Sequence, residues 1–428
     1  MGTRELRLAL IPLLLSLPFH EPSRAASADA AEVAAIDLEK LDVDRRARRD
    51  RNRVAPRIAR YIEAAVKEVD SGNPEEAKRL LLKLRPSRLN PNERGSVFRL
   101  LAYVSYGTED YEGAIGYFEK VLAEEVLSVR DEAKMRFNIA QLFAAIQRWP
   151  DVIAWVDQWR RFVETPDPLG FYLAGIAHYQ LEDFDAAIVD TKKAVELTSE
   201  PREAWLRLLA ALYAQQQDYE NTVPVLEELV LRYPKKQYWV QLSLLYGTRE
   251  EYRMSLAVQQ VAYSQGLLTE DKELRRLTRS YLYHELPYPA AQVLEKGLEA
   301  DVIESDVESL ELLANSWIAA REYDRSLSPL RQAAERSDDG ELYVRLGQVH
   351  MQREEWREAS EMLKQAVEKG GLEDPGNAQL LIGICYYNDE RVARARSSFL
   401  RARKHDSTRL AADRWITHLE RESASEEG

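Results

Sequence analysis

Apolar residues recur three and four positions apart along most of the chain, which predicts amphipathic helices. The helix-favouring residues Leu, Ala, Glu, Arg and Gln are abundant in these segments. Alternating Val, Ile and Thr residues are scarce, and only 18 of the 428 residues are Gly, which disfavours an all-β fold. The pattern therefore predicts an all-α protein.

A large aromatic residue, preceded by a polar turn and followed three positions later by a small residue, marks a recurring unit. Examples are the segments TEDYEGAI, LEDFDAAI and REEWREAS. These landmarks lie 33 to 38 residues apart, at Tyr111, Trp149, Phe184, Tyr219, Tyr252, Tyr288, Tyr323 and Trp356. The spacing resembles that of the tetratricopeptide repeat, a helical hairpin of about 34 residues. We therefore expect a right-handed superhelical solenoid of about ten hairpins over residues 56–405.

Other positions of the repeat also match, because small residues recur where two helices must approach closely. Gly175, Gly347 and Gly383 occupy such positions in the expected first helices. Pro224 and Pro329 fall inside expected second helices, where each removes a backbone hydrogen bond and should bend the helix. We expect a last amphipathic helix within residues 406–428, ahead of an acidic tail, to cover the exposed end of the array.

The first 28 residues resemble a secretory signal peptide. Arg4 and Arg7 precede an apolar stretch from Leu8 to Phe19, and the small residues of Ala26-Ser27-Ala28 suit a cleavage site. The apolar stretch is shorter than the roughly 20 residues that cross a bilayer. We therefore expect a cleaved, exported chain in the periplasm that has no transmembrane segment.

Residues 29–55 are expected to form a flexible charged linker that contains the basic run RRARRDRNR, Arg45 to Arg53. This run could touch anionic lipid or an acidic partner, but a solvated, partly disordered lead-in is the simpler interpretation. The formal net charge of the chain is −13, which opposes binding to nucleic acid, because a phosphate backbone needs a clustered positive surface.

Cys385 is the only cysteine. An intramolecular disulfide is therefore excluded, and so is the acylated amino-terminal cysteine of a lipoprotein. The segment LLIGICYYN places Cys385 on an apolar helix face, which predicts a buried, inert thiol.

The common catalytic and cofactor-binding motifs are missing from the sequence, including His-Glu-x-x-His, paired cysteines, phosphate-binding glycine loops and the Gly-x-Ser-x-Gly elbow. His178 and His350 fall on inward helix positions and are expected to be structural. We therefore expect no enzyme activity, no cofactor and no metal.

Protein binding is the activity that a stacked array of hairpins offers, through a concave groove lined by the first helices. In the repeat family, the residues that face this groove lie one, five and eight positions after the first bulky residue. The predicted groove residues are Arg99, Tyr103, Tyr106, Phe137, Gln141, Tyr172, Tyr179, Arg207, Arg276 and Tyr283. Tyr and Arg suit an extended or helical peptide. Alternatively, about half of these tyrosines pack between neighbouring hairpins.

Several segments resemble one particular family, the periplasmic tetratricopeptide-repeat component encoded beside the TonB, ExbB and ExbD energy-coupling genes of Gram-negative bacteria. They include LRYPKKQYWVQLSLLYG, LPYPAAQVLEKGLEADVIE and ELLANSWIAAREYDRSLSPL. The resemblance implies a non-enzymatic accessory to TonB-dependent uptake, with TonB, ExbD or a TonB-dependent receptor as its partner. It assigns no site residue and leaves the oligomeric state open. The alternatives are an adaptor for polysaccharide export or outer-membrane proteins, and a regulatory subunit of a cell-wall hydrolase or protease.

Overall fold

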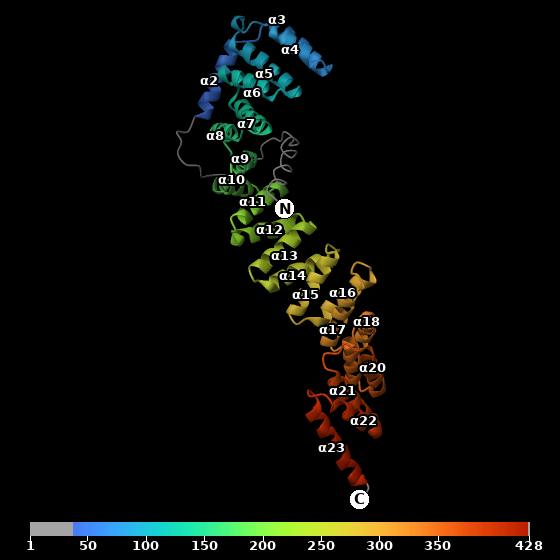
Figure 1. The fold of residues 1–428 in the computed structure, drawn as a ribbon. Coiled ribbons are helices and arrows are strands. Elements are labelled where there is room, and N and C mark those ends of the chain that lie inside the picture. Colours follow the sequence, from blue (N-terminus) through green and yellow to red (C-terminus); the bar gives the residue numbers. More distant parts are fainter. Residues whose placement is uncertain (1–36, 427–428) are drawn as a thin grey trace. The chain divides into compact units, whose positions relative to one another are not determined.

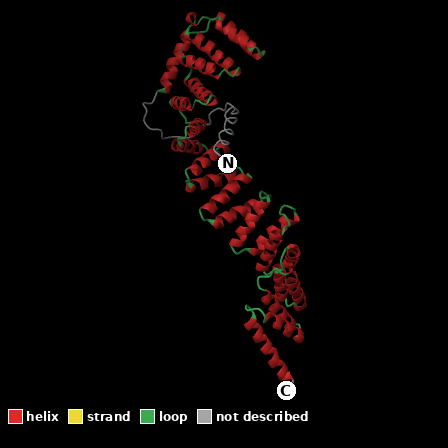
Figure 2. Cartoon of the chain, in the orientation of Figure 1, coloured by secondary structure: helices red, strands yellow, loops and turns green. Residues whose placement is uncertain are grey.

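The computed structural model describes residues 37–426, and the expected signal peptide lies outside this range. The described residues form 22 α-helices and one short 3-10 helix, with no strand among them (Figures 1 and 2). The chain divides into two compact units, residues 1–233 and 234–428. The all-α prediction is therefore confirmed.

The described part of the first unit is helix α2 (Leu38–Arg51) followed by five hairpins, each packed on the next. The hairpins are α3 (Pro56–Asp70) with α4 (Pro74–Leu82), α5 (Pro91–Gly107) with α6 (Tyr111–Ala123), α7 (Val129–Ala145) with α8 (Trp149–Arg160), α9 (Pro168–Gln180) with α10 (Phe184–Glu196), and α11 (Glu203–Gln215) with α12 (Tyr219–Arg232).

The second unit contains five further hairpins and a final helix, α23 (Arg409–Glu426). The hairpins are α13 (Lys236–Thr248) with α14 (Tyr252–Ser264), α15 (Asp271–Tyr283) with α16 (Pro287–Glu299), α17 (Val307–Ala319) with α18 (Tyr323–Arg336), α19 (Glu341–Gln352) with α20 (Trp356–Lys369), and α21 (Pro375–Asn388) with α22 (Val392–Ala402). The ten hairpins of the described chain match the number expected from the repeat spacing.

The aromatic landmarks mark the starts of second helices. Tyr111 begins α6 and Trp356 begins α20, and Tyr288 is the second residue of α16. Helices α12 and α18 continue through Pro224 and Pro329, so both prolines lie inside second helices as expected.

Each hairpin turn uses one residue in the left-handed backbone region, two positions before the second helix begins. Gly72 occupies this position in the first hairpin, and the other nine hairpins have a non-glycine residue there with φ between 56° and 63°. These residues are Glu109, Gln147, Glu182, Gln217, Glu250, Glu285, Arg321, Glu354 and Glu390. In the α5–α6 turn, the Asp110 amide donates to the Ser105 carbonyl oxygen at 2.8 Å. This bond satisfies a carbonyl group at the helix end, so the turn closes despite the unfavourable φ.

Small residues let the two helices of a hairpin touch. A Cβ atom at Gly383 of α21 would lie 2.4 Å from the ring of Phe399 on α22, which is fully buried. At Gly175 of α9, a Cβ atom would lie 2.3 Å from the Thr191 hydroxyl on α10. Both glycines were predicted from the repeat register, and their close contacts explain why a small residue is needed there.

Helix α23 packs on the last hairpin of the second unit. The ring of Trp415 stacks on that of Phe399 with centroids 5.3 Å apart and planes 9° apart. Ile416 and Leu419 are buried in the same cluster. The hairpins begin at Pro56 and end at Ala402, close to the limits expected for the solenoid, and α23 covers apolar surface that α22 would otherwise expose.

The basic run differs from its expected form, because most of it belongs to α2 and packs on the first unit. Arg45 is buried and forms an ion pair with buried Glu132 of α7. Arg48 donates to Glu125 at 2.6 Å. The expected linker, residues 29–55, therefore contains a docked helix. The carboxylates that hold it lie more than 70 residues along the chain, so local sequence did not reveal them.

Candidate functional site: an exposed arginine and tyrosine stripe

Three of the predicted groove residues form one exposed stripe on α5, which we call the α5 stripe: Arg99, Tyr103 and Tyr106. Their spacing of four and three residues places them on the same side of the helix. Tyr103 is 49% exposed, Tyr106 is 48% exposed and Arg99 is also exposed. The stripe therefore offers two large aromatic side chains and one guanidinium to solvent.

Residues at the N-terminus of α5 cap the helix. Pro91 occupies the first turn, and Asn90 and Glu93 form a reciprocal capping box in which each side chain accepts a backbone N–H of the other residue. The Glu93 side chain also accepts the Ala55 amide at 3.0 Å, which ties α5 to the start of α3. The backbone that carries the stripe is therefore fixed before any partner binds.

Aromatic contacts with α6 fix the two tyrosine rings of the stripe. Tyr103 packs edge-on against Phe118, with ring centroids 5.5 Å apart and an angle of 83° between the planes. Tyr106 contacts Tyr111 at 6.1 Å. Each ring is thus held on one side while about half of the side chain remains exposed. A partner would meet rings that have already lost conformational freedom, which favours binding.

The other predicted groove residues of the first unit are less exposed, with the exception of Arg207 on α11. Gln141 is half-buried. Phe137 is half-buried against Trp159, and Tyr179 against Phe184. Phe137 and Tyr179 thus pack against the second helix of their own hairpin.

Tyr172 is a core residue and not a groove residue. It is only 5% exposed, and its ring lies 5.7 Å from that of Trp205. Burial raises the pKa of Tyr172 to about 12. The helical spacing rule failed here because Trp205, from the next hairpin, covers this face of α9.

The second unit has its own exposed aromatic group at two hairpin turns. Tyr283, at the end of α15, is 68% exposed, and its ring lies 5.2 Å from that of Tyr252. Tyr252 and Tyr288 are each 42% exposed, and Arg276 is also exposed. In the sequence, Tyr252 and Tyr288 are recognisable only as repeat landmarks. Their position at the start of second helices, next to polar turns, was the signal that they could reach the surface.

The two histidines expected to be structural contact carboxylates, and the single cysteine is buried. His350 is buried, and its Nδ1 lies 2.6 Å from Glu355. His178 lies 3.6 Å from both Asp183 and Asp190. Cys385 is fully buried, and burial raises its pKa to about 12, so the prediction of a buried thiol is confirmed.

The described residues contain neither a metal-binding cluster nor a membrane-spanning helix. Among these residues, no group of three or more His, Cys, Asp or Glu side chains is arranged to hold a metal ion. No helix in the described part of the chain combines the length and the apolar character needed to cross a membrane.

Comparison with known proteins supports the repeat. Residues 344–409, from α19 to the start of α23, match the family model of the tetratricopeptide repeat. No curated protein matches the chain. The match agrees with the repeat inferred from the aromatic spacing.

Several solved structures are similar to the chain at low identity. MamA (residues 41 to the end) from Desulfovibrio magneticus RS-1 is 24% identical, with 40% of this chain and 96% of that chain covered and a TM-score of 0.30. A tetratricopeptide repeat protein from Parabacteroides merdae ATCC 43184 is 13% identical, with 71% and 99% covered and a TM-score of 0.34. Naa15/Naa10 bound to HypK-THB is 13% identical, with 76% and 66% covered and a TM-score of 0.41. At these values the similarities carry no argument about function.

Proposed function

We propose that this chain is a non-enzymatic scaffold for protein–protein interaction and that the α5 stripe binds a segment of its partner. The supporting observation is the exposure of Arg99, Tyr103 and Tyr106 on a helix whose start is capped and whose rings are packed. Helical-repeat arrays commonly bind other proteins through such extended surfaces.

The side chains of the stripe indicate the kind of segment that would bind. Arg99 and Tyr106 are seven residues apart, which is about 10 Å along a helix axis. This length suits two turns of a partner helix or about three residues of an extended strand. The ring faces supply apolar contact, while two hydroxyl groups and a guanidinium supply hydrogen bonds. Tyr and Arg are also the residues that most often dominate binding energy at interfaces.

We further propose that the scaffold works in the periplasm as an accessory of TonB-dependent uptake across the outer membrane. The support for this is the resemblance of the segments quoted above to the periplasmic repeat component of TonB, ExbB and ExbD systems. TonB, ExbD and the plug of a TonB-dependent receptor are then the candidate partners.

Titration of the purified chain with the periplasmic segments of TonB and ExbD and with a receptor plug tests this function. We expect one of them to bind, and the double substitution Tyr103→Ala/Tyr106→Ala to weaken that binding by about 30-fold or more, because interface tyrosines commonly contribute at least about 1 kcal/mol each. The matched control is Val189→Ala, which removes an exposed apolar side chain (67% exposed) from second helix α10. Equal affinities for wild type, control and double variant would exclude the α5 stripe as the binding surface.

A further inference from the structure

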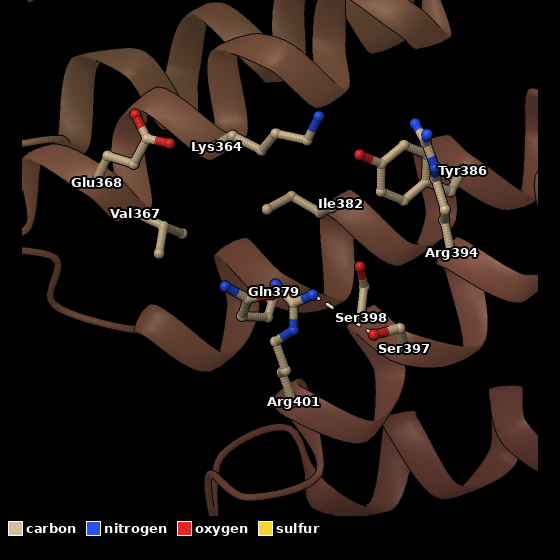
Figure 3. Close-up of a pocket in the computed structure, with 10 residues that line it drawn as sticks. All are labelled: Lys364, Val367, Glu368, Gln379, Ile382, Tyr386, Arg394, Ser397, Ser398 and Arg401. Carbon is tan, nitrogen blue, oxygen red and sulfur yellow. Dashed lines mark hydrogen bonds between the residues drawn. The ribbon is translucent and has the colours of Figure 1, made fainter.

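A cavity of about 440 Å³ lies in the second unit, between helices α20, α21 and α22. Lys364 lines it from α20, Arg394 and Arg401 line it from α22, and Ile382 of α21 lies between them (Figure 3). The α5 stripe belongs to the other unit, so this cavity is a separate site.

One end of the cavity carries two cations around a buried tyrosine. The Lys364 ammonium lies 5.3 Å from the centre of the Tyr386 ring, and the Arg394 guanidinium carbon lies 5.8 Å from it. Burial alone would lower the pKa of Lys364, but hydrogen bonds to Glu361 and Tyr386 outweigh burial and raise it. Lys364 is therefore charged at neutral pH.

The other end combines a third cation with a buried amide. Arg401 donates a weak hydrogen bond to the Ser397 hydroxyl at 3.4 Å. Gln379 is only 8% exposed, and its Oε1 is buried without a hydrogen-bond partner in the described part of the chain. An amide group can accept or donate a hydrogen bond, and buried polar groups normally have partners. The unpartnered Oε1 only accepts hydrogen bonds, so it does not pair with a carboxylate of a ligand.

The arginines in α22 and directly after it differ in their partners. Arg396 and Arg403 reach carboxylates of α23, Glu420 at 3.4 Å and Asp413 at 2.8 Å. Arg394 and Arg401, which face the cavity, have no carboxylate within 4.0 Å among the described residues. Their charges are therefore available to a ligand.

The charge balance of the lining favours an anion. Three cations, Lys364, Arg394 and Arg401, and one carboxylate, Glu368, line the cavity, and Glu361 pairs with Lys364 at 2.7 Å, so the formal sum of these five groups is 3 − 2 = +1. This local surplus occurs in a chain whose formal net charge is −13. Guanidinium groups bind carboxylates with charge-assisted hydrogen bonds.

We propose that this cavity binds an acidic peptide segment in which two carboxylates flank one apolar side chain. One carboxylate meets Arg394 and Lys364, the other meets Arg401, and the apolar side chain contacts half-buried Val367 beside Ile382 (Figure 3). The apolar centre is the reason for choosing a peptide over a free anion. The proposal rests on the scaffold function proposed above, and it defines a second contact for an acidic partner.

Calorimetric titration of the full chain with an acetylated, amidated Glu-Leu-Glu peptide tests the proposal. The matched peptide Gln-Leu-Gln has the same shape without charge and should bind at least tenfold more weakly. Affinity for the acidic peptide should also fall as the salt concentration rises, because the interaction is between charges. Equal binding of the two peptides, or no binding of the acidic one, would overturn the proposal. Displacement of the peptide by an equal concentration of inorganic phosphate would also overturn the proposal, because the site would then bind a simple anion.

Two double substitutions in and directly after α22 test whether the peptide binds the cavity or only the general positive charge of this segment. Arg394→Gln/Arg401→Gln should lower the affinity for the acidic peptide at least tenfold. Arg396→Gln/Arg403→Gln should leave this affinity unchanged. If the second pair weakens binding as much as the first, the cavity is not the site. Thermal unfolding of each variant shows whether the fold is intact, and the comparison of the two peptides on wild type needs no variant. Tyr103→Ala/Tyr106→Ala should keep full peptide affinity, so that failure of this proposal is distinguishable from failure of the α5 stripe.

Discussion

Replacement of Phe399 by alanine should loosen the carboxyl-terminal hairpin and leave the first unit unchanged. Phe399 is fully buried on α22. Its ring fills the space next to Gly383 of α21 and stacks on Trp415 of α23 at 5.3 Å. This one side chain therefore joins three consecutive helices.

The size of the effect follows from burial. Truncation of a buried Phe to Ala costs about 3–5 kcal/mol through lost apolar contact and the cavity left behind. In a stacked array, each hairpin is stabilised mainly by its neighbours, so the loss should be confined to the helices around α22. A local loss of about 4 kcal/mol corresponds to roughly a 10³-fold drop in protection from hydrogen exchange.

Amide hydrogen exchange followed by mass spectrometry measures this directly. We expect the Phe399→Ala variant to lose protection in α21, α22 and α23, with protection in α3 to α6 unchanged. The control Leu400→Ala changes the next residue of the same helix, which is 39% exposed, and should alter stability by less than about 0.5 kcal/mol. An equal loss of protection in both units, or equal effects of the two substitutions, would refute the reasoning.

Three further predictions concern other parts of the chain. Gln147→Gly should stabilise the chain by about 0.5–1 kcal/mol in denaturant unfolding, because Gln147 has φ 59°. Ala140→Gly, inside α7, should instead destabilise it by about 1 kcal/mol or more, and a loss of stability in both variants would contradict this prediction. Arg45→Met should remove hydrogen-exchange protection from α2, because it breaks the ion pair with Glu132 of α7, whereas Arg46→Met at an exposed position should not. Retained protection in the Arg45 variant would show that this ion pair does not hold α2 in place. Burial raises the pKa of Cys385 to about 12 from its ordinary value of 9.0, so the native chain at pH 8 should contain roughly 10³-fold less thiolate than the unfolded chain. It should therefore react with a disulfide reagent only on unfolding, and rapid labelling of the native chain would contradict the burial.

The repeat could be predicted from sequence because its determinants are local. A hairpin is specified by an aromatic residue at the start of its second helix and by small residues such as Gly175 and Gly383 where the helices touch. These positions recur at nearly constant spacing, and each hairpin packs on its neighbours in sequence. Periodicity in the chain therefore translates directly into periodicity in space.

The features that sequence analysis missed depend on contacts between distant residues. Arg45 belongs to a basic run typical of a solvated linker, but Glu132 neutralises it from 87 residues away. Tyr172 occupies a predicted groove position, but Trp205 of the next hairpin covers it. Neither partner can be assigned from helical spacing alone.

The candidate site was only partly predictable for the same reason. Arg99, Tyr103 and Tyr106 are exposed, because α6 contacts only one side of each tyrosine ring through Phe118 and Tyr111. The cavity at Arg394 and Arg401 was not predicted. Which arginines of α22 find a carboxylate depends on where α23 packs, and the sequence pattern does not show that.

Site-specific photocrosslinking in cells tests the central claim of a binding surface on α5 most directly. A photoreactive amino acid placed at Tyr103 and, in a separate variant, at Val189 would compare the α5 stripe with an exposed position on a second helix. We expect a discrete crosslink from position 103 to TonB, ExbD or a TonB-dependent receptor, and none from position 189. Identical crosslinking from both positions, or none from position 103 in cells that use the uptake system, would contradict it.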